Sequence, residues 1–168
     1  MGDGIPLTPR ERRAWTSYQR MSAALQAHLQ QSLHRDCGLS LADYEVLFAL
    51  YTSPEGRLRA LDLRCALGWE KSRLSHQIRR MAERELLCRE PNPADARSAV
   101  VCILDKGRKA IEKAAPEYLA RLRADFLNLL TPAQLDALTE ISETVLTHLI
   151  RQEHEREQDG EDATGDQP

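Results

Sequence analysis

The sequence predicts a mainly α-helical chain with a small β-wing: a winged helix-turn-helix flanked by long N- and C-terminal helices. Three observations support this fold class. Apolar residues recur at spacings of three and four over most of the chain. Near the centre, a short helical segment (61–67), a glycine and a longer helix with a polar outer face follow one another. Two β-prone runs, 86–90 and 98–104, then flank the polar turn 91–97.

Helix-start signals divide the rest of the chain. Thr8 and Glu11 form a capping-box pattern with Pro9 between them, and Ser40 and Asp43 repeat the pattern. A third box, at 131–134, starts the last helix. We therefore predict a flexible N-terminus (1–8), a dimerisation helix (9–36), a winged helix-turn-helix (40–104), C-terminal dimerisation helices (105–152) and a disordered acidic tail (153–168).

The helix predicted over 70–85 has two faces. On a helical wheel, Leu74, Ile78 and Met81 fall within about 60° of one another and must be buried. The opposite side carries polar and cationic residues: Ser72, Ser75, His76, Arg79 and Arg80, with Arg73 and Arg84 on one flank. An α-helix fits the major groove of B-DNA, where such side chains reach base edges. A solvated basic face is the alternative.

Positive charge is concentrated in the central segment. The whole chain has a net charge of −3, which alone argues against a nucleic-acid partner. Residues 57–109, however, hold 13 Lys or Arg against 7 Asp or Glu, whereas the remainder holds 10 against 19. The local surplus matters more than the sum for binding a polyanion.

Several protein classes are excluded by what the sequence lacks. No apolar run is long enough for a transmembrane helix, and the N-terminus has no signal-peptide pattern, so a cytoplasmic protein without membrane contact is expected. No phosphate loop, nucleophile elbow or paired-carboxylate pattern indicates an enzyme. Four separated cysteines form no CxxC pair, and His34 with Cys37 is half a metal motif, so no metal or other cofactor is expected.

The long helices outside the winged module need partners for their apolar faces. The module is too small to cover the N-terminal helix and the two C-terminal ones, and the same surface on a second copy can do so. We therefore expect a homodimer. An intramolecular bundle is the alternative.

Four segments make the chain resemble the MarR family of bacterial winged-helix transcription regulators, over roughly residues 10–150. They are Leu67–Met81, Leu86–Arg89, Asp95-Ala96-Arg97-Ser98 and Leu104–Gly107. The Asp-x-Arg wing signature is the most specific of them. The resemblance implies a homodimer on double-stranded DNA, commonly as a repressor, with two helices about one DNA turn (~34 Å) apart on a roughly palindromic operator.

The resemblance also implies roles for individual residues. Ser72, Arg73, Ser75 and His76 would face the major groove, while Arg79 and Arg80 would bind phosphates. Gln77 lies nearer the apolar stripe, so both packing and a base contact remain open for it. Arg97 would enter the minor groove with its guanidinium held extended by Asp95.

Regulation in the family commonly depends on a small aromatic ligand held between the winged module and the dimer helices. Trp15, Tyr18, Tyr44 and Tyr118 are the candidates to line such a pocket, although each can equally be core. A redox-sensing cysteine is the alternative, and Cys37 is expected to be the most exposed thiol, with a pKa lowered by His34 and Arg35; Cys65, Cys88 and Cys102 fall among core positions. A winged-helix protein-interaction module is a further alternative, but it would lack the wing arginine.

One position departs from the family pattern. The family usually has glycine where this chain has Glu85, just after the predicted DNA-facing helix. A positive φ at Glu85 would be strained by about 1 kcal/mol.

Overall fold

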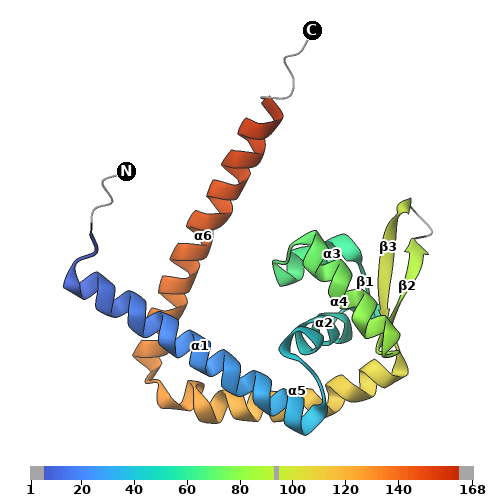
Figure 1. The fold of residues 1–168 in the computed structure, drawn as a ribbon, viewed down its shortest axis with the longest axis horizontal. Helices are drawn as coiled ribbons and strands as arrows, with labels where there is room; N and C mark the ends of the chain where they lie inside the picture. Colours follow the sequence, from blue (N-terminus) through green and yellow to red (C-terminus); the bar gives the residue numbers. More distant parts are fainter. Residues whose placement is uncertain (1–5, 93–94, 163–168) are drawn as a thin grey trace. The chain divides into compact units, whose positions relative to one another are not determined.

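The computed structural model describes residues 6–92 and 95–162, and within these ranges the side chains of all residues except 92, 95–98 and 153–162. Its elements are α1 (Pro9–Cys37), α2 (Leu41–Tyr51), η1 (Pro54–Gly56), β1 (Arg57–Arg59), α3 (Ala60–Leu67), α4 (Lys71–Glu83), β2 (Leu87–Asn92), β3 (Asp95–Ile103), α5 (Asp105–Asp125), η2 (Leu127–Leu129) and α6 (Pro132–Asp162) (Figure 1). The chain forms two compact units, Met1–Arg123 and Ala124–Pro168.

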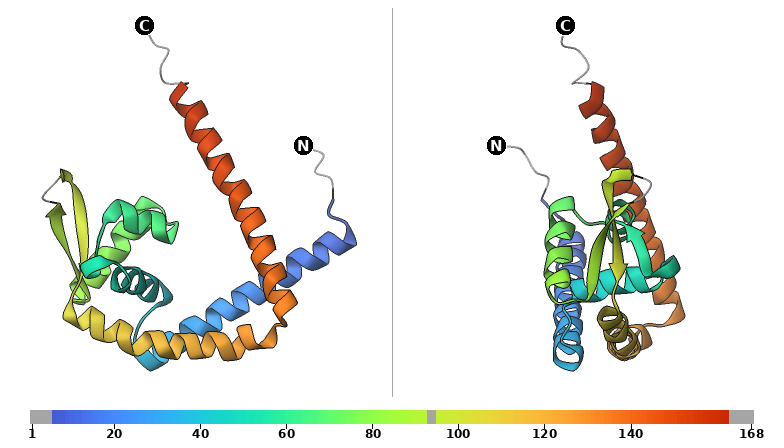
Figure 2. Two further views of the ribbon diagram at one scale, coloured as in Figure 1. Left: turned by 180° about the vertical axis from the view of Figure 1, so that it is seen from behind. Right: turned by 90° about the vertical axis from the view of Figure 1, so that its right-hand side faces the viewer.

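The first unit contains the winged helix-turn-helix that the sequence predicts. Its sheet is antiparallel with the order β1-β3-β2, and the β2–β3 hairpin projects from the helices as a wing (Figure 2). The α3–α4 turn is made by Gly68, which adopts φ 62° and closes the end of α3. Short helix, glycine turn and longer helix therefore appear in the predicted order.

The core of this unit is formed where α2, α3 and α4 meet the sheet and α5. Leu47, Leu63, Met81, Val101 and Ile111 are fully buried. Gly107 is required where α5 begins, because a Cβ there would lie 2.0 Å from the backbone oxygen of Leu86. The first turn of α5 is thus packed directly on the base of the wing.

All three capping boxes are present. Thr8 with Glu11, and Ser40 with Asp43, exchange side-chain and backbone hydrogen bonds at the starts of α1 and α2. Thr131 and Gln134 do the same at the start of α6. The helix starts read from the sequence are therefore confirmed.

Three details differ from the sequence-based expectation. Helical spacing predicts Tyr44, Leu47, Phe48 and Tyr51 as the buried face of α2, but Phe48 and Tyr51 are exposed, and Val46 and Leu50 are buried instead. Apolar spacing predicts a helix that continues from Ile111 to Leu129, but α5 ends at Asp125 and is followed by η2. Helix α6 continues to Asp162, so the expected start of the disordered tail at residue 153 is corrected; residues 153–162 contain no proline and are rich in good helix formers.

Glu85 adopts the left-handed backbone conformation that would be strained for a residue other than glycine, with φ 60°. Among the residues whose side chains the structure describes, Glu85 pairs with Lys106 at 3.4 Å; both groups are exposed, and such pairs contribute little to stability. The strain at Glu85 is therefore not offset by its side chain.

Replacing Glu85 with glycine should raise the free energy of unfolding by about 1 kcal/mol, because glycine adopts positive φ without steric cost. Urea unfolding of the purified protein measures the change. The matched control is Glu83→Gly, in the last turn of α4, which should lower the free energy of unfolding by about 1 kcal/mol. Equal destabilisation by both changes would contradict the strain at Glu85.

Candidate nucleic-acid interface

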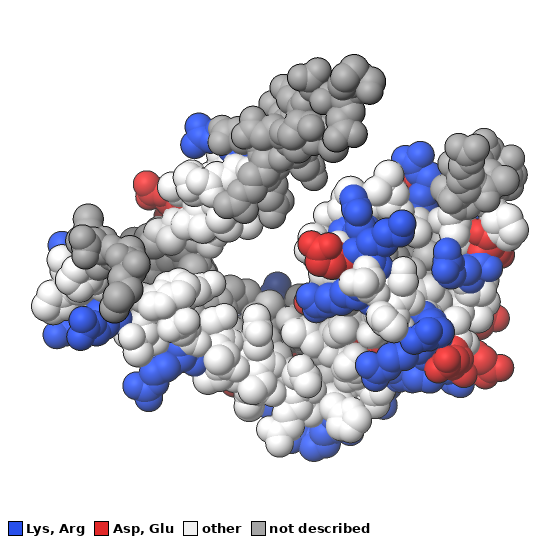
Figure 3. Space-filling model, turned by 45° about the horizontal axis from the view of Figure 1, so that its top comes forward, with Lys and Arg blue, Asp and Glu red and all other residues white. Residues whose placement is uncertain are grey.

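Helix α4 separates its side chains as the helical wheel predicts. Leu74, Ile78 and Met81 are buried in the core. The polar side is exposed: Lys71, Ser72, Arg73, Ser75, His76, Arg79 and Arg80. On the face drawn in Figure 3, Lys and Arg gather over the part of the first unit that holds α3, α4 and the strands. An exposed row of hydroxyl and cationic groups is thus held on a rigid helix.

Two contacts arrange the cations along this face. The guanidinium of Arg73 lies 4.0 Å from the ring centroid of the buried Trp69, which positions it by a cation–π contact. One turn later, Nη2 of Arg79 lies 2.8 Å from Nδ1 of His76. Glu70 is the N-cap residue of α4, and its side chain makes no capping hydrogen bond. The backbone N–H groups in the first turn of α4 can therefore donate to a bound phosphate or base. These groups suit phosphate and base-edge oxygens.

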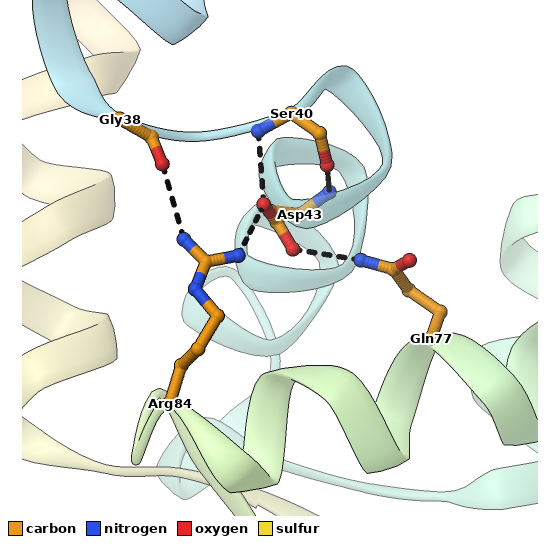
Figure 4. Close-up of polar contacts among 5 residues, drawn as sticks. All are labelled: Gly38, Ser40, Asp43, Gln77 and Arg84. Carbon is orange, nitrogen blue, oxygen red and sulfur yellow. Dashed lines mark hydrogen bonds and ion pairs between the residues drawn. The ribbon is translucent and has the colours of Figure 1, made fainter.

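A buried carboxylate, Asp43, fixes α4 against the start of α2 (Figure 4). Its Oδ1 accepts a hydrogen bond of 2.7 Å from the amide of Gln77, in the middle of α4. Its Oδ2 accepts one of 2.7 Å from Arg84, at the end of α4, and one of 2.9 Å from the backbone N–H of Ser40. Arg84 also donates to the backbone oxygen of Gly38, where α1 ends. One carboxyl group therefore ties α1, α2 and α4 together.

The charge on Asp43 is stabilised by these partners. Burial raises the pKa of its carboxyl group, but the hydrogen bonds from Arg84 and Ser40 outweigh the burial and hold the pKa below its ordinary value. Asp43 is therefore ionised at neutral pH and pairs with Arg84 as a full charge.

The structure decides between the two roles left open for Gln77. The residue is 8% exposed, and its amide donates to Asp43. Gln77 therefore packs inside the unit. The wing residues Asp95 and Arg97 belong to β3 by their backbone, but their side chains lie outside the part of the chain that the structure describes.

The four aromatic residues expected in a ligand pocket form two pairs. Trp15 and Tyr18 stack on the exposed surface of α1 with centroids 5.9 Å apart, and Tyr44 and Tyr118 pack at 4.3 Å. Of the four, Tyr118 lines the pocket found between α1 and α5. Its other lining residues are Leu29, Ser32, Leu33, Asp36, Cys37, Glu117 and Arg121. The water-accessible space inside is about 10 Å³, room for a single water molecule.

The expectations for two cysteines are corrected. Cys37 is partly buried; burial raises the pKa of its thiol, even though Lys113 nearby lowers it, and Arg35 is paired with Asp36 instead. The lowered pKa expected for Cys37 is therefore wrong. Cys65, placed among core positions by the sequence, is exposed on α3. The pattern failed there because an eight-residue helix has too few turns to define a buried face.

Two residues that support the interface were missed by sequence reasoning: Trp69 supports Arg73, and Asp43 orients α4. Arg84, which the helical wheel places on the flank of the polar face, pairs with Asp43 in the structure. Trp69 directly precedes the basic helix, and an aromatic at that place is a signal that could have been used. The Asp43 contacts span more than 30 positions in the sequence and leave no local signal.

This geometry defines a class of protein. A winged helix-turn-helix whose second helix presents hydroxyl and cationic side chains to solvent is a DNA-binding transcription regulator. The family model described as MarR family matches residues 39–99. With the relatives described next, this match shows that the chain belongs to the MarR family.

Two solved relatives from Streptomyces coelicolor cover 87% of this chain. AbsC, a MarR family transcriptional regulator, is 34% identical over 98% of its own length, with a TM-score of 0.83. Sco3205, a MarR family transcriptional regulator solved in complex with DNA, is 32% identical over 92% of its length, with a TM-score of 0.84. BpsR from Bordetella bronchiseptica, whose DNA binding is regulated by 6-hydroxynicotinic acid, shares the fold at 23% identity, with a TM-score of 0.67, covering 79% of this chain and 98% of its own. A comparison with curated protein sequences finds no match.

The described part of the chain also bears on membrane association. None of its helices is long and apolar enough to cross a bilayer.

Replacing Asp43 with alanine should lower the free energy of unfolding by about 3 kcal/mol, because the buried amide of Gln77 loses its acceptor and α2 loses half of its capping box. Urea unfolding at pH 7 measures the loss. The matched control is Asp62→Ala, an exposed carboxylate paired with Arg59, which should leave the free energy of unfolding nearly unchanged.

The pH dependence gives an independent check. A carboxyl group whose pKa is lower in the folded than in the unfolded state stabilises the fold above its unfolded pKa, and this contribution is lost as the pH falls through the folded pKa. The stability difference between wild type and Asp43→Asn should therefore be largest near about pH 7 and shrink toward about pH 3. A difference that does not change with pH would contradict the ionised pair.

Proposed function

We propose that the protein is a homodimeric transcriptional repressor that binds a pseudo-palindromic operator in double-stranded DNA. The observation that carries the proposal is the exposed face of α4, which offers hydroxyl groups and cations while its opposite face is buried. A relative 32% identical to this chain, Sco3205, has been solved in complex with DNA, which supports the same partner here.

In this proposal the residues of α4 divide into two roles. Ser72, Arg73, Ser75 and His76, in its first half, read base edges in the major groove. Arg79 and Arg80, further along, bind phosphates. Arg97, held extended by Asp95, enters the neighbouring minor groove from the wing.

Exposed apolar faces in both units support the homodimer. In the first unit, α1 exposes Trp15, Tyr18 and Met21. In the second unit, α6 exposes one apolar row: Ile141, Val145, Leu146, Leu149 and Ile150. Soluble single chains rarely expose continuous apolar surfaces of this kind, and an identical surface on a second copy covers them symmetrically.

A small aromatic ligand that releases the DNA is the regulatory part of the proposal. The pocket between α1 and α5 offers Tyr118 as an aromatic surface. Arg121, which lies 3.8 Å from Asp36 in the same lining, would exchange this exposed ion pair for the carboxylate of a ligand. Since the pocket has room for one water in this conformation, a ligand must move α1 away from α5. Such a ligand acts only if it binds the DNA-incompetent arrangement more tightly.

Binding to the DNA that flanks its own gene, measured by fluorescence anisotropy across salt concentrations, tests the DNA contacts. Arg80→Ala should weaken binding to all sequences alike and reduce the salt slope by about 1. Arg73→Ala should reduce discrimination between operator and unrelated DNA by about 1–3 kcal/mol. Arg97→Ala should weaken binding broadly. Arg123→Ala, an exposed arginine near the end of α5, is the control and should change neither quantity. A salt slope near zero in the wild type would refute the phosphate contacts.

Light scattering after size exclusion tests the dimer. Leu149→Asp should convert the dimer to a monomer, because it places a charge within the apolar row of α6. Thr147→Asp adds the same charge on the opposite side of the same helix and should leave the dimer intact. A monomeric wild type, or dissociation by both changes, would overturn the proposed interface.

A further inference from the structure

Two thiols and a carboxylate lie together on the outer face of the wing sheet. Cys88 in β2 is paired directly with Cys102 in β3, and Glu90 lies two residues further along β2, on the same face. Leu87 and Val101, their neighbours in sequence, point the other way into the core. The two sulfur atoms and a carboxylate oxygen all lie within 4.8 Å of one another.

Arg57 orients the carboxylate of this cluster. It lies on β1 opposite Cys102 and donates a hydrogen bond to Oε2 of Glu90. The other oxygen, Oε1, accepts a long hydrogen bond of 3.9 Å from Sγ of Cys88 and so faces the thiols. A second-layer donor that fixes one carboxylate oxygen is typical of a metal ligand.

We propose that Cys88, Cys102 and Glu90 bind a divalent cation of the zinc type, with water as the fourth ligand. Tetrahedral coordination at the usual Zn–S and Zn–O lengths places the ligand atoms about 3.5–3.8 Å apart, so atoms that lie within 4.8 Å of one another must approach by at most about 1 Å. Two thiolates and a carboxylate bound to a dication leave one negative charge, which the guanidinium of Arg57 balances.

Binding must release the protons of both thiols to solvent. Affinity for the cation should therefore rise with pH. The site depends on β1–β3 alone and not on the proposed DNA contacts.

Titration of the reduced full-length protein with Co²⁺ tests the site, because thiolate ligation to cobalt gives a charge-transfer absorption band. We expect the band to saturate at one equivalent per chain, and Zn²⁺ to displace the cobalt. Cys88→Ser and Cys102→Ser should each remove the band. Cys65→Ser and Cys37→Ser are the matched controls and should retain it. Circular dichroism establishes that every variant is folded.

Two further variants test the geometry. Glu90→Gln should weaken Zn²⁺ binding by about 10–100-fold, and Arg57→Ala by about tenfold, both measured against a chromophoric chelator. The proposal is overturned if the reduced wild type gives no band, or if the band persists in Cys88→Ser and Cys102→Ser. The proposal is also overturned if the protein is isolated with a Cys88–Cys102 disulfide and still binds no cobalt after this disulfide is reduced. An unchanged affinity in Glu90→Gln removes Glu90 from the ligand set.

Discussion

The position of helix α4 depends on one buried carboxylate. Asp43 is 3% exposed, and its two oxygens accept hydrogen bonds from the middle of α4, from the end of α4 and from the start of α2. The apolar stripe of α4 would allow the helix to slide or rotate on the core, because hydrophobic contacts are not directional. Hydrogen bonds at two points separated by two turns fix both its rotation and its position along the axis.

This arrangement also joins the surfaces proposed for two different partners. Arg84 bonds both to Asp43 and to the backbone of Gly38, where α1 ends. Helix α1 exposes the aromatic residues proposed for the dimer, and α4 exposes the residues proposed for DNA. A displacement of the end of α1 therefore acts on the end of α4 through a single arginine. Arg84 therefore links the proposed ligand pocket beside α1 to α4, the helix proposed to face DNA.

Local sequence signals predicted most of the fold, and long-range contacts explain what they missed. Capping boxes, the glycine at 68 and the alternation of β-prone runs act over a few residues, so the helix starts and the wing could be read from the sequence. Helix α2 is apolar on nearly all sides, and its buried face could not be chosen by periodicity. Gln77 lies at the edge of the stripe of α4, and its burial depends on Asp43, which is remote in the sequence.

The same distinction holds for the candidate site. The exposure of Ser72, Arg73, Arg79 and Arg80 follows from the periodicity of α4 and could be predicted from the sequence, while their contacts with DNA stay a prediction. The environments of the thiols could not be predicted, because the exposure of a cysteine and the pKa of its thiol depend on elements that pack against it from elsewhere in the chain. Cys88 and Cys102 meet only through strand register, which the sequence does not state.

The contact at Gly107 has a mechanical meaning. With no Cβ in the way, the first turn of α5 lies directly against the carbonyl of Leu86, and the amide of Leu104 donates to that same oxygen. The root of the hairpin and the start of α5 thus form one stiff joint. A force applied to the hairpin by a bound duplex would then displace the start of α5 together with the hairpin, because the chain does not bend easily between them.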